Sequence, residues 1–181
     1  SAGGNAIATA EVYDPSTNTW TAAGSMAAGL TWHGAVRLAS GKVLVAGGMI
    51  GTSYANRAEL FDPATNSWTL ASSLATARGG HSTTLLPDGR VLVAGGINSV
   101  GVLASAEIYD PNTNTWSAAR ALARARYTHT ATVLSNGKVL AAGGYDGGTT
   151  MRASATAEVY DATTDTWESA PRLPAPVTNA A

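Results

Sequence analysis

The sequence predicts an all-β protein made of several copies of one four-stranded antiparallel sheet. A segment of about 48 residues recurs along the chain, each copy holds four short strand signals separated by turn residues, and no stretch keeps a helical period. A chain of 181 residues has the size of one domain. We therefore expect one domain over residues 1–181, with repeat units at about 1–31, 32–79, 80–127 and 128–181.

Two phrases carry the repeat. The phrase AEVYDPSTNTW at residues 10–20 returns three times with small changes, and its tryptophan advances by 48, 48 and 51 residues. The later copies occupy residues 58–68, 106–116 and 157–167. The second phrase, KVLVAGG or a close variant, ends at Gly48, Gly96 and Gly144. Recurrence within one chain indicates that each copy occupies an equivalent environment.

The first two strands of a copy are predicted to form a hairpin. In the second copy the first strand covers about 33–38, the turn residues 39–42, and the second strand about 42–46. The equivalent turns of later copies contain Asp-Gly and Asn-Gly, which supply the positive φ that tight hairpins need.

The third and fourth strands are predicted to form a second hairpin. The third strand lies at residues 58–61 and the fourth is centred on Trp68, with DPATN at residues 62–66 as the turn. In this turn proline presets φ, the Asp side chain accepts backbone N–H bonds, and Asn tolerates a left-handed backbone.

Large side chains on both faces of such a sheet require neighbouring copies to stack, which predicts the blades of a β-propeller. Two aromatic residues per copy are expected to fill the gaps between blades. They are Tyr13, Phe61, Tyr109 and Tyr160 on the third strand, and Trp20, Trp68, Trp116 and Trp167 on the fourth. A Cβ at the double glycine that ends each second strand could collide with an aromatic ring or a neighbouring backbone, so these glycines are expected to make room for the tryptophan. Replacing one buried tryptophan by alanine is expected to destabilise the fold by about 3–5 kcal/mol.

The order of these features resembles the kelch repeat: a double glycine, then Glu-x-Tyr-Asp-Pro, then Thr-Asn-x-Trp, then small residues leading to Arg-x-x-His. The resemblance covers nearly the whole chain. It implies a kelch-type β-propeller of four-stranded antiparallel blades around a central axis, with the histidine-led strand innermost and the tryptophan strand outermost. Some positions depart from the pattern, since Leu30 and Val177 stand where other copies have Arg78 and Arg126.

Counting strands gives about three complete blades plus part of another. The chain starts at Gly3-Gly4, the end of a second strand, and stops at Ala181, where a first strand is due. Two arrangements are open. Residues 176–181 pair with the N-terminal blade and close a small ring, or the chain is an arc of a larger propeller, completed by residues outside it or by another copy. We favour the arc, because no segment resembles the missing inner hairpin.

Histidine and glutamate also recur at fixed places. A metal or acid-base role is one interpretation of His33, His81 and His129, but their periodicity favours packing and hydrogen bonding, since a catalytic histidine is normally unique. The glutamates lie in an otherwise apolar strand and are expected to be structural, with Arg78 and Arg126 as candidate partners. They are Glu11, Glu59, Glu107 and Glu158. Four acids spread around a ring do not suggest the paired carboxylates of a glycosidase.

Residues that break the repeat are better candidates for binding, because the scaffold does not explain their variation. They lie in the loops after the double glycine, at residues 49–57, 97–105 and 145–156, and in the connections into the next blade. An up-down blade places these loops on one face, which mixes aromatic residues and arginines as binding hot spots do. The candidate binding residues are Trp32, Tyr54, Arg57, Arg78, Arg126, Tyr127, Tyr145, Asp146 and Arg152. The alternative is that several of them simply cover the blade ends.

Composition excludes several function classes. A net charge of −1 provides no field for nucleic-acid phosphates, and the absence of cysteine excludes disulfides and thiolate chemistry. No apolar run approaches the roughly 20 residues of a membrane span, and no secretory signal is visible. We predict no nucleic acid and no membrane as partners. Richness in Ala, Thr and Ser suits an extracellular or cell-surface bacterial protein.

The leading hypothesis is a non-enzymatic scaffold, without cofactor or metal, whose loops bind a protein or glycan partner. One alternative is a sugar-active kelch enzyme, such as a galactose-oxidase-like copper enzyme or a sugar epimerase. The lack of cysteine rules out the Tyr–Cys cofactor of the oxidase, and no unique acid-base pair suggests the epimerase. A third reading is a self-assembling module, completed as a homo-oligomer that closes the propeller.

Overall fold

The computed structural model describes residues 6–147 and 152–178, and within these ranges the chain is all-β. Three four-stranded antiparallel sheets follow a two-stranded sheet, and we number them blades 1 to 4 in chain order.

Blade 1 consists of β1 (Ala10–Asp14) and β2 (Thr19–Ala23). Blade 2 consists of β3 (Gly34–Arg37), β4 (Val43–Ala46), β7 (Ala58–Asp62) and β8 (Ser67–Ala71). Blade 3 consists of β9 (Ser82–Leu85), β10 (Val91–Ala94), β13 (Ala106–Asp110) and β14 (Thr115–Ala119). Blade 4 consists of β16 (Thr130–Val133), β17 (Val139–Ala142), β19 (Ala157–Asp161) and β20 (Thr166–Ala170).

Three short strand pairs extend from the complete blades. They are β5 (Met49–Ile50) with β6 (Ser53–Tyr54), β11 (Ile97–Asn98) with β12 (Gly101–Val102), and β15 (Arg126–Tyr127) with β18 (Tyr145–Asp146). No helix long and apolar enough to cross a membrane occurs in residues 6–147 and 152–178.

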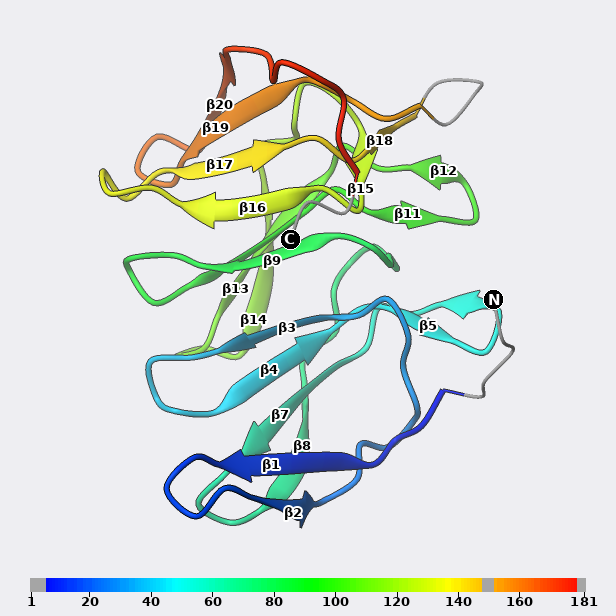
Figure 1. Cartoon of the computed structure of the whole chain (residues 1–181), viewed down its shortest axis with the longest axis vertical. Helices are drawn as coiled ribbons and strands as arrows, with labels where there is room; N and C mark the ends of the chain where they lie inside the picture. The colour runs from blue at the N-terminus through cyan, green and yellow to red at the C-terminus, as the bar shows by residue number, and fades with distance from the viewer. Residues whose placement is uncertain (1–5, 148–151, 179–181) are drawn as a thin grey trace.

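The blades are arranged as in a propeller. The first strands contact one another in order, β3 with β9 and β9 with β16, while the fourth strands lie at the opposite edge of each sheet (Figure 1). Three complete blades and the outer half of another were predicted, and this all-β architecture is confirmed. The expected strand end at Gly3-Gly4 lies outside the described residues.

Ring closure by the C-terminal segment is not observed where that segment is described. The Val177 N–H bonds to the Ser154 carbonyl at 3.1 Å, and the Val177 carbonyl accepts from Gly144 at 2.9 Å, so both bonds stay within the last repeat unit. Residues 179–181 of the segment lie outside the described ranges.

Turn chemistry fixes both hairpins of a blade. Asn66 and Asn114 end the outer turns with φ of 51° and 53°, and Gly89 ends an inner turn with φ of 88°. The Asp62 carboxylate accepts the N–H of Ala64 at 2.9 Å, so the turn satisfies its own backbone donor. The predicted turns are therefore present where residue type required them.

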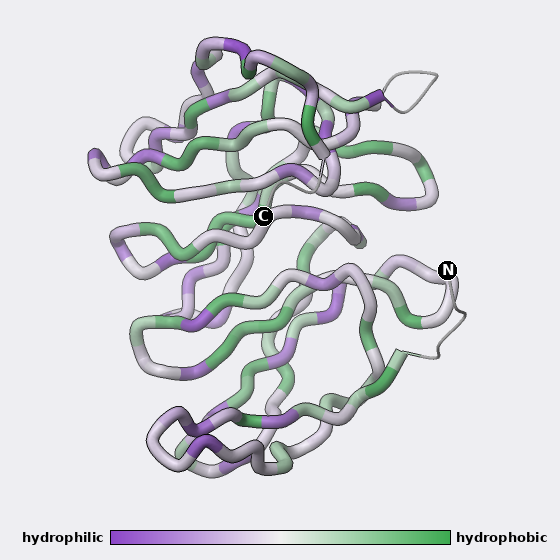
Figure 2. The backbone as a smooth tube through the Cα atoms, viewed as in Figure 1, coloured by the Kyte–Doolittle hydropathy of each residue, from purple (hydrophilic) through white to green (hydrophobic). Residues whose placement is uncertain are grey.

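The core lies in the joints between neighbouring blades. Leu86 and Leu92 of the blade 3 inner hairpin pack against Val139 and Tyr160 of blade 4. The joint between blades 2 and 3 repeats this packing with Leu38, Leu44, Val91 and Tyr109. Hydrophobic residues follow the strands, whereas the turns that join them are largely hydrophilic (Figure 2). Each blade thus depends on its neighbour to bury its apolar faces.

The two aromatic residues of a blade have different roles. Tyr109 and Trp116 face each other across the strand pair with ring centroids 5.0 Å apart, but Tyr109 is fully buried and Trp116 only partly. The Trp116 indole N–H donates to the Ser72 carbonyl of the preceding blade's connector at 2.7 Å. Trp20 has no such neighbour among the described residues and is 66% exposed. Tyr109 and Tyr160 fill the joints as predicted, and Trp68, Trp116 and Trp167 also pack against the joint clusters while staying partly exposed.

The double glycines make room for neighbouring backbone, as expected, and for histidine, whereas the expectation that they accommodate tryptophan is wrong. A Cβ on Gly47 would lie 2.6 Å from the His81 ring and 2.7 Å from the Arg78 carbonyl. Gly47 also has φ of 66°, a conformation in which a side chain is strained. The next blade can approach closely only because the side chain is missing.

Candidate binding face

The variable loops gather on one side of the molecule, as predicted. Loops 49–57 and 97–105, together with the described parts of loop 145–156, project opposite the hairpin turns (Figure 1). We call this side the loop face. Residues 148–151 of the last loop lie outside the described ranges.

Four aromatic side chains from separate segments meet on the loop face, and we call Trp32, Tyr54, Tyr127 and Tyr145 the aromatic cluster. Tyr127 lies between Trp32 and Tyr145, with ring centroids 6.4 Å and 5.2 Å away and planes tilted by 25° and 24°. Burial, followed by the nearby Tyr145 and Tyr54, raises the pKa of Tyr127. A Cβ on Gly79 would lie 3.4 Å from both Trp32 and Tyr54. Trp32 is therefore the exposed end of a row of rings in which Tyr127 is buried and Tyr145 is partly buried.

A backbone ladder supports the aromatic cluster. Gly80 donates its N–H to the Trp32 carbonyl at 2.9 Å, and Thr128 donates to the Gly80 carbonyl at 2.7 Å. All three residues have positive φ, at 56°, 62° and 49° in chain order. The ladder ties consecutive connectors together, so the cluster rests on a fixed base.

Asp146 and Arg152 lie at the border of the aromatic cluster. Asp146 is partly buried in β18 next to Tyr145, and its N–H donates to the Arg152 carbonyl at 3.0 Å. Arg152 is exposed. The backbone of Arg152 thus lies next to Asp146, which follows Tyr145 in β18.

Arg78 and Arg126 are buried instead of being presented on the loop face. The Arg78 guanidinium donates to the Gly95 and Ser105 carbonyls at 2.7 and 2.8 Å and to the Glu107 carboxylate at 2.9 Å. Burial lowers the pKa of Arg78, an effect that Glu107 opposes. Arg126 makes the equivalent bonds to Gly143, Thr156 and Glu158. These arginines are joint clamps, and their contribution to a binding surface is not supported.

Arg57 makes the glutamate contact that a clamp arginine makes in the other blades. Blade 2 follows the connector that carries Leu30 in place of the clamp arginine, and there the Arg57 Nε donates to Glu59 at 2.8 Å. Arg57 occupies the position of Ser105 in the next repeat. The arginine that pairs with the blade 2 glutamate therefore lies just before β7 instead of in the connector.

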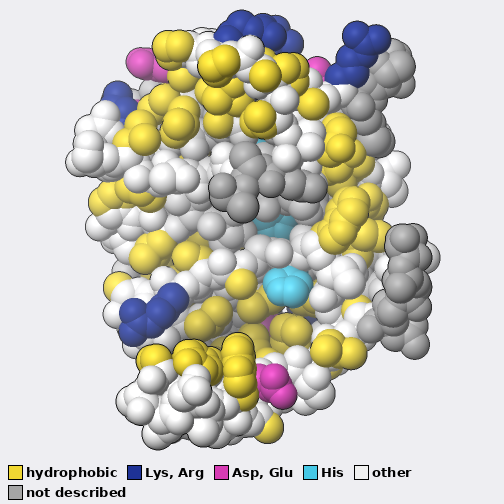
Figure 3. All heavy atoms as spheres, in the orientation of Figure 1, with side chains coloured by type: hydrophobic (Ala, Val, Ile, Leu, Met, Phe, Trp, Pro, Cys, Tyr) yellow, Lys and Arg dark blue, Asp and Glu magenta, His cyan; other side chains and the backbone are white. Residues whose placement is uncertain are grey.

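His81 and His129 lie in the joints, which agrees with a packing role, whereas His33 is exposed. His81 and His129 are buried, and burial, followed by the charge of the neighbouring clamp arginine, lowers the pKa of each to about 3. His129 Nε2 lies 3.0 Å from Ser82 Oγ, whereas neither ring nitrogen of His81 has a hydrogen-bond partner within the described part of the chain. Histidine side chains are visible in the middle of the face shown in Figure 3.

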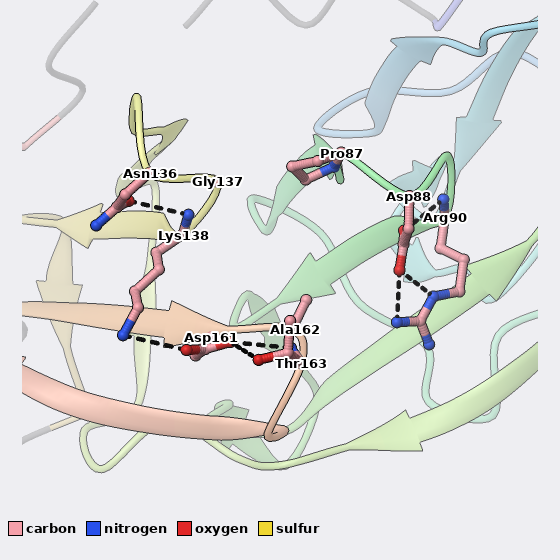
Figure 4. Close-up of a pocket in the computed structure, with 9 residues that line it drawn as sticks. All are labelled: Pro87, Asp88, Arg90, Asn136, Gly137, Lys138, Asp161, Ala162 and Thr163. Carbon is pink, nitrogen blue, oxygen red and sulfur yellow. Dashed lines mark hydrogen bonds and ion pairs between the residues drawn. The ribbon is translucent and has the colours of Figure 1, made fainter.

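The opposite side carries a polar cleft of about 610 Å³ between the turns of blades 3 and 4 (Figure 4). Its charges are already paired: Arg90 with Asp88 at 2.7 Å and Lys138 with Asp161 at 3.1 Å. Each cation lies against a turn carboxylate, so these groups stabilise the turns and leave the cleft without a concentrated charge.

Sequence reasoning missed two apolar residues on the side of blade 2. Ile50 and Leu70 are 42% and 67% exposed and border a groove of about 410 Å³ next to Tyr54. Other copies carry Asn98 and Ala118 at these positions. A position-by-position comparison of the repeats would have found them.

The comparisons with known proteins agree with the architecture. A model of the KLHDC2/KLHL20/DRC7 Kelch-repeats domain matches residues 2–177. A search of the curated proteins found no match. Since the family model covers nearly the whole chain and the blades, turns and joints follow one repeated plan, the chain belongs to the kelch-repeat family.

Proposed function

We propose that the loop face binds a protein partner and that the aromatic cluster anchors it. Kelch domains are in general protein-binding scaffolds and are typically non-enzymatic. Rigid blades that carry variable loops fit this role, because the scaffold orders the loops before the partner arrives.

The observation that carries the proposal is the conformation of Trp32. Its side chain is 52% exposed and its φ is 56°, a region that a bulky residue rarely adopts. Gly80 occupies the same place in the next copy, so the fold accepts glycine there. A left-handed backbone disfavours a side chain by about 1–2 kcal/mol, and a large ring kept in spite of this supports a use for the ring.

A glycan is the second candidate partner. The planes of Trp32 and Tyr127 differ by 25° and those of Tyr127 and Tyr145 by 24°, and the exposed Trp32 ring offers an apolar face to a sugar. Asp146 and the Arg152 backbone lie next to Tyr145, at the other end of this row of rings. The homo-oligomer and the sugar-active enzyme stay as alternatives, and turnover of a sugar substrate would contradict the binding-module proposal.

The test is the Trp32→Gly variant, which removes the ring where the backbone already suits glycine. A phage-displayed random peptide library selected on the wild-type protein should give peptides that bind this variant at least about tenfold more weakly, as expected for loss of a hot-spot ring. Thermal unfolding should show that the fold is kept.

The matched control is Val100→Gly, since Val100 is 92% exposed in a neighbouring loop outside the aromatic cluster. It should bind the selected peptides as the wild type does. Equal binding by the Trp32→Gly variant would contradict the proposal. A glycan array that gives a ligand with the same Trp32 dependence, while no peptide is selected, would identify a sugar partner instead.

A further inference from the structure

Within residues 6–147 and 152–178, strand β1 is paired on one side only. Its counterparts β7, β13 and β19 each have two neighbours in their sheets, whereas β1 pairs with β2 alone. Among the described residues, no other strand or loop forms a backbone hydrogen bond with residues 10–14. The second edge of β1 is therefore an exposed template for another strand.

A cleft of about 490 Å³ lies beside this edge, between blade 1 and blade 2. Ala10 and Val12 line one wall, and Val43 and Phe61 line the other. Figure 3 shows a hollow between blade 1, at the bottom of the view, and blade 2, with apolar side chains at its borders. Val12 is 39% exposed, whereas its counterpart Ile108 is 6% exposed. The cleft thus exposes side chains of a kind that other blades bury.

The other joints show what occupies the equivalent space. Between blades 3 and 4 it is filled by Leu86, Leu92 and Ala94, which come from the inner hairpin β9–β10. Between blades 2 and 3 the same places are taken by Leu38, Leu44 and Ala46 from β3–β4. In both cases the second strand of the hairpin pairs antiparallel with the strand equivalent to β1. The spacing Leu-x5-Leu-x-Ala is therefore the signature of the side chains that fit this space.

We propose that the cleft between blades 1 and 2 is a docking site for a β-hairpin of this inner type. The second strand of the hairpin extends the sheet at β1, and its Leu-x5-Leu-x-Ala side chains enter the cleft against Val12, Val43 and Phe61. Recognition combines main-chain pairing along the edge with apolar side chains at alternate positions, as in other cases of strand addition. The site is separate from the aromatic cluster, so the proposal does not depend on the loop-face function.

The probe is a synthetic peptide with the sequence of residues 82–96, STTLLPDGRVLVAGG, added to the protein in solution. Because an isolated hairpin is only marginally folded, the titration should extend to about 1 mM. We expect saturable NMR shifts in β1 and β4 and at least about fivefold slower hydrogen exchange of the β1 amides, since pairing protects them.

Two controls test specificity. A peptide with Leu86→Asp and Leu92→Asp should bind at least about tenfold more weakly, because it places carboxylates in an apolar cleft. In the protein, Val12→Asp should abolish docking, while Val100→Asp, at an exposed site elsewhere, should not. Equal melting temperatures of the two protein variants would show that neither unfolds the blades.

Several outcomes would overturn the proposal. They are shifts that map away from β1 and β4, equal binding of the aspartate peptide, no response up to the solubility limit, or β1 amides already protected in the free monomer. Since Trp32→Gly leaves the cleft intact, peptide docking should survive in that variant, which separates this test from that of the loop face.

Discussion

Gly34 and Ser82 occupy the same place in consecutive repeats, and each faces a histidine of the following blade. A Cβ on Gly34 would overlap Thr83 Oγ1 and lie 2.8 Å from Thr83 Cβ. At the next joint Ser82 is accommodated, and the counterpart of Thr83 is the smaller Ala131. One joint thus combines a glycine with a threonine, and the next combines a serine with an alanine. Only in the second joint does a serine hydroxyl lie within hydrogen-bonding distance of the histidine.

This difference between the two joints predicts a compensating pair of substitutions. Gly34→Ser alone should destabilise the protein by about 1–3 kcal/mol, since it overpacks the joint. The same change with Thr83→Ala should recover most of the loss and add about 1 kcal/mol from a new serine–His81 hydrogen bond. Urea denaturation of the two single variants and the double variant measures the coupling. Additive effects of the two substitutions would contradict the prediction.

The buried histidines predict a loss of stability in acid. The pKa of His81 and of His129 is lowered to about 3 in the folded state, by burial and then by Arg78 and Arg126 respectively. The unfolded chain, whose histidines titrate near about 6.5, therefore binds more protons between these values. Stability is fully present above the unfolded pKa and falls as the pH drops toward 3, by up to about 1.4 kcal/mol per pH unit for each histidine.

Denaturation midpoints at pH 7 and pH 5 check this expectation. His129→Gln should reduce the difference between the two midpoints, and His33→Gln, at the exposed position, is the matched control. An unchanged difference in His129→Gln would show that other groups cause the acid sensitivity.

At the scale of the element, the connector between blades acts as a bracket. The Arg78 carbonyl accepts a hydrogen bond from the Gly48 N–H of the preceding blade at 2.7 Å. The Arg78 guanidinium donates to the following blade. The same connector donates the Ala75 N–H to Glu107 at 2.7 Å. One short segment thus holds two sheets through side chain and main chain together.

The contacts of this connector predict which substitutions lower the stability of the fold and which restore it. Arg78→Ala leaves Glu107 buried without its cation and should destabilise the fold by about 3–5 kcal/mol. Arg57→Ser should cost less because Arg57 is partly exposed. Adding Leu30→Arg to Arg57→Ser recreates the arrangement of Arg78 and Ser105, and denaturation should then show recovery. Failure to recover would mean that Leu30 is required for the packing of the first joint.

Much of this element could be predicted from the sequence, because repetition shows which residue types a position demands. The four strands, the Asn and Gly turns and the pairing of glutamate with Arg78 all follow from residue type and period. The burial of Arg78 and Arg126 could not be predicted, since an arginine near a loop end satisfies the pattern whether it faces solvent or crosses a joint. Only the position of the Gly95 and Ser105 carbonyls decides between the two.

At the scale of the whole molecule, the last connector lacks the donors of the others. In earlier connectors, the residue four places after the tryptophan donates its N–H to the next blade, as Ser72 does to Asn114 at 3.0 Å. The residue seven places after it donates to the next glutamate. In blade 4 these places are Pro171 and Pro174, which have no N–H, and Val177 replaces the clamp arginine.

We therefore expect a monomer at micromolar concentration, because blade 4 offers few bonds to blade 1 of another copy. The combined substitution Pro171→Ala, Pro174→Ala and Val177→Arg restores all three donors toward Glu11 and Asn18. It should produce concentration-dependent head-to-tail association, measured by sedimentation velocity. Association of the wild type, or none in the triple variant, would contradict this account of the joint.

The ladder of Trp32, Gly80 and Thr128 has a practical consequence. Only main-chain atoms form its hydrogen bonds. Tryptophan, glycine and threonine can therefore occupy the same position in successive repeats without altering the blades. The backbone structure at these three positions thus does not depend on which side chain is present. A combinatorial library at residues 32, 80 and 128 would sample new specificities on one unchanged framework.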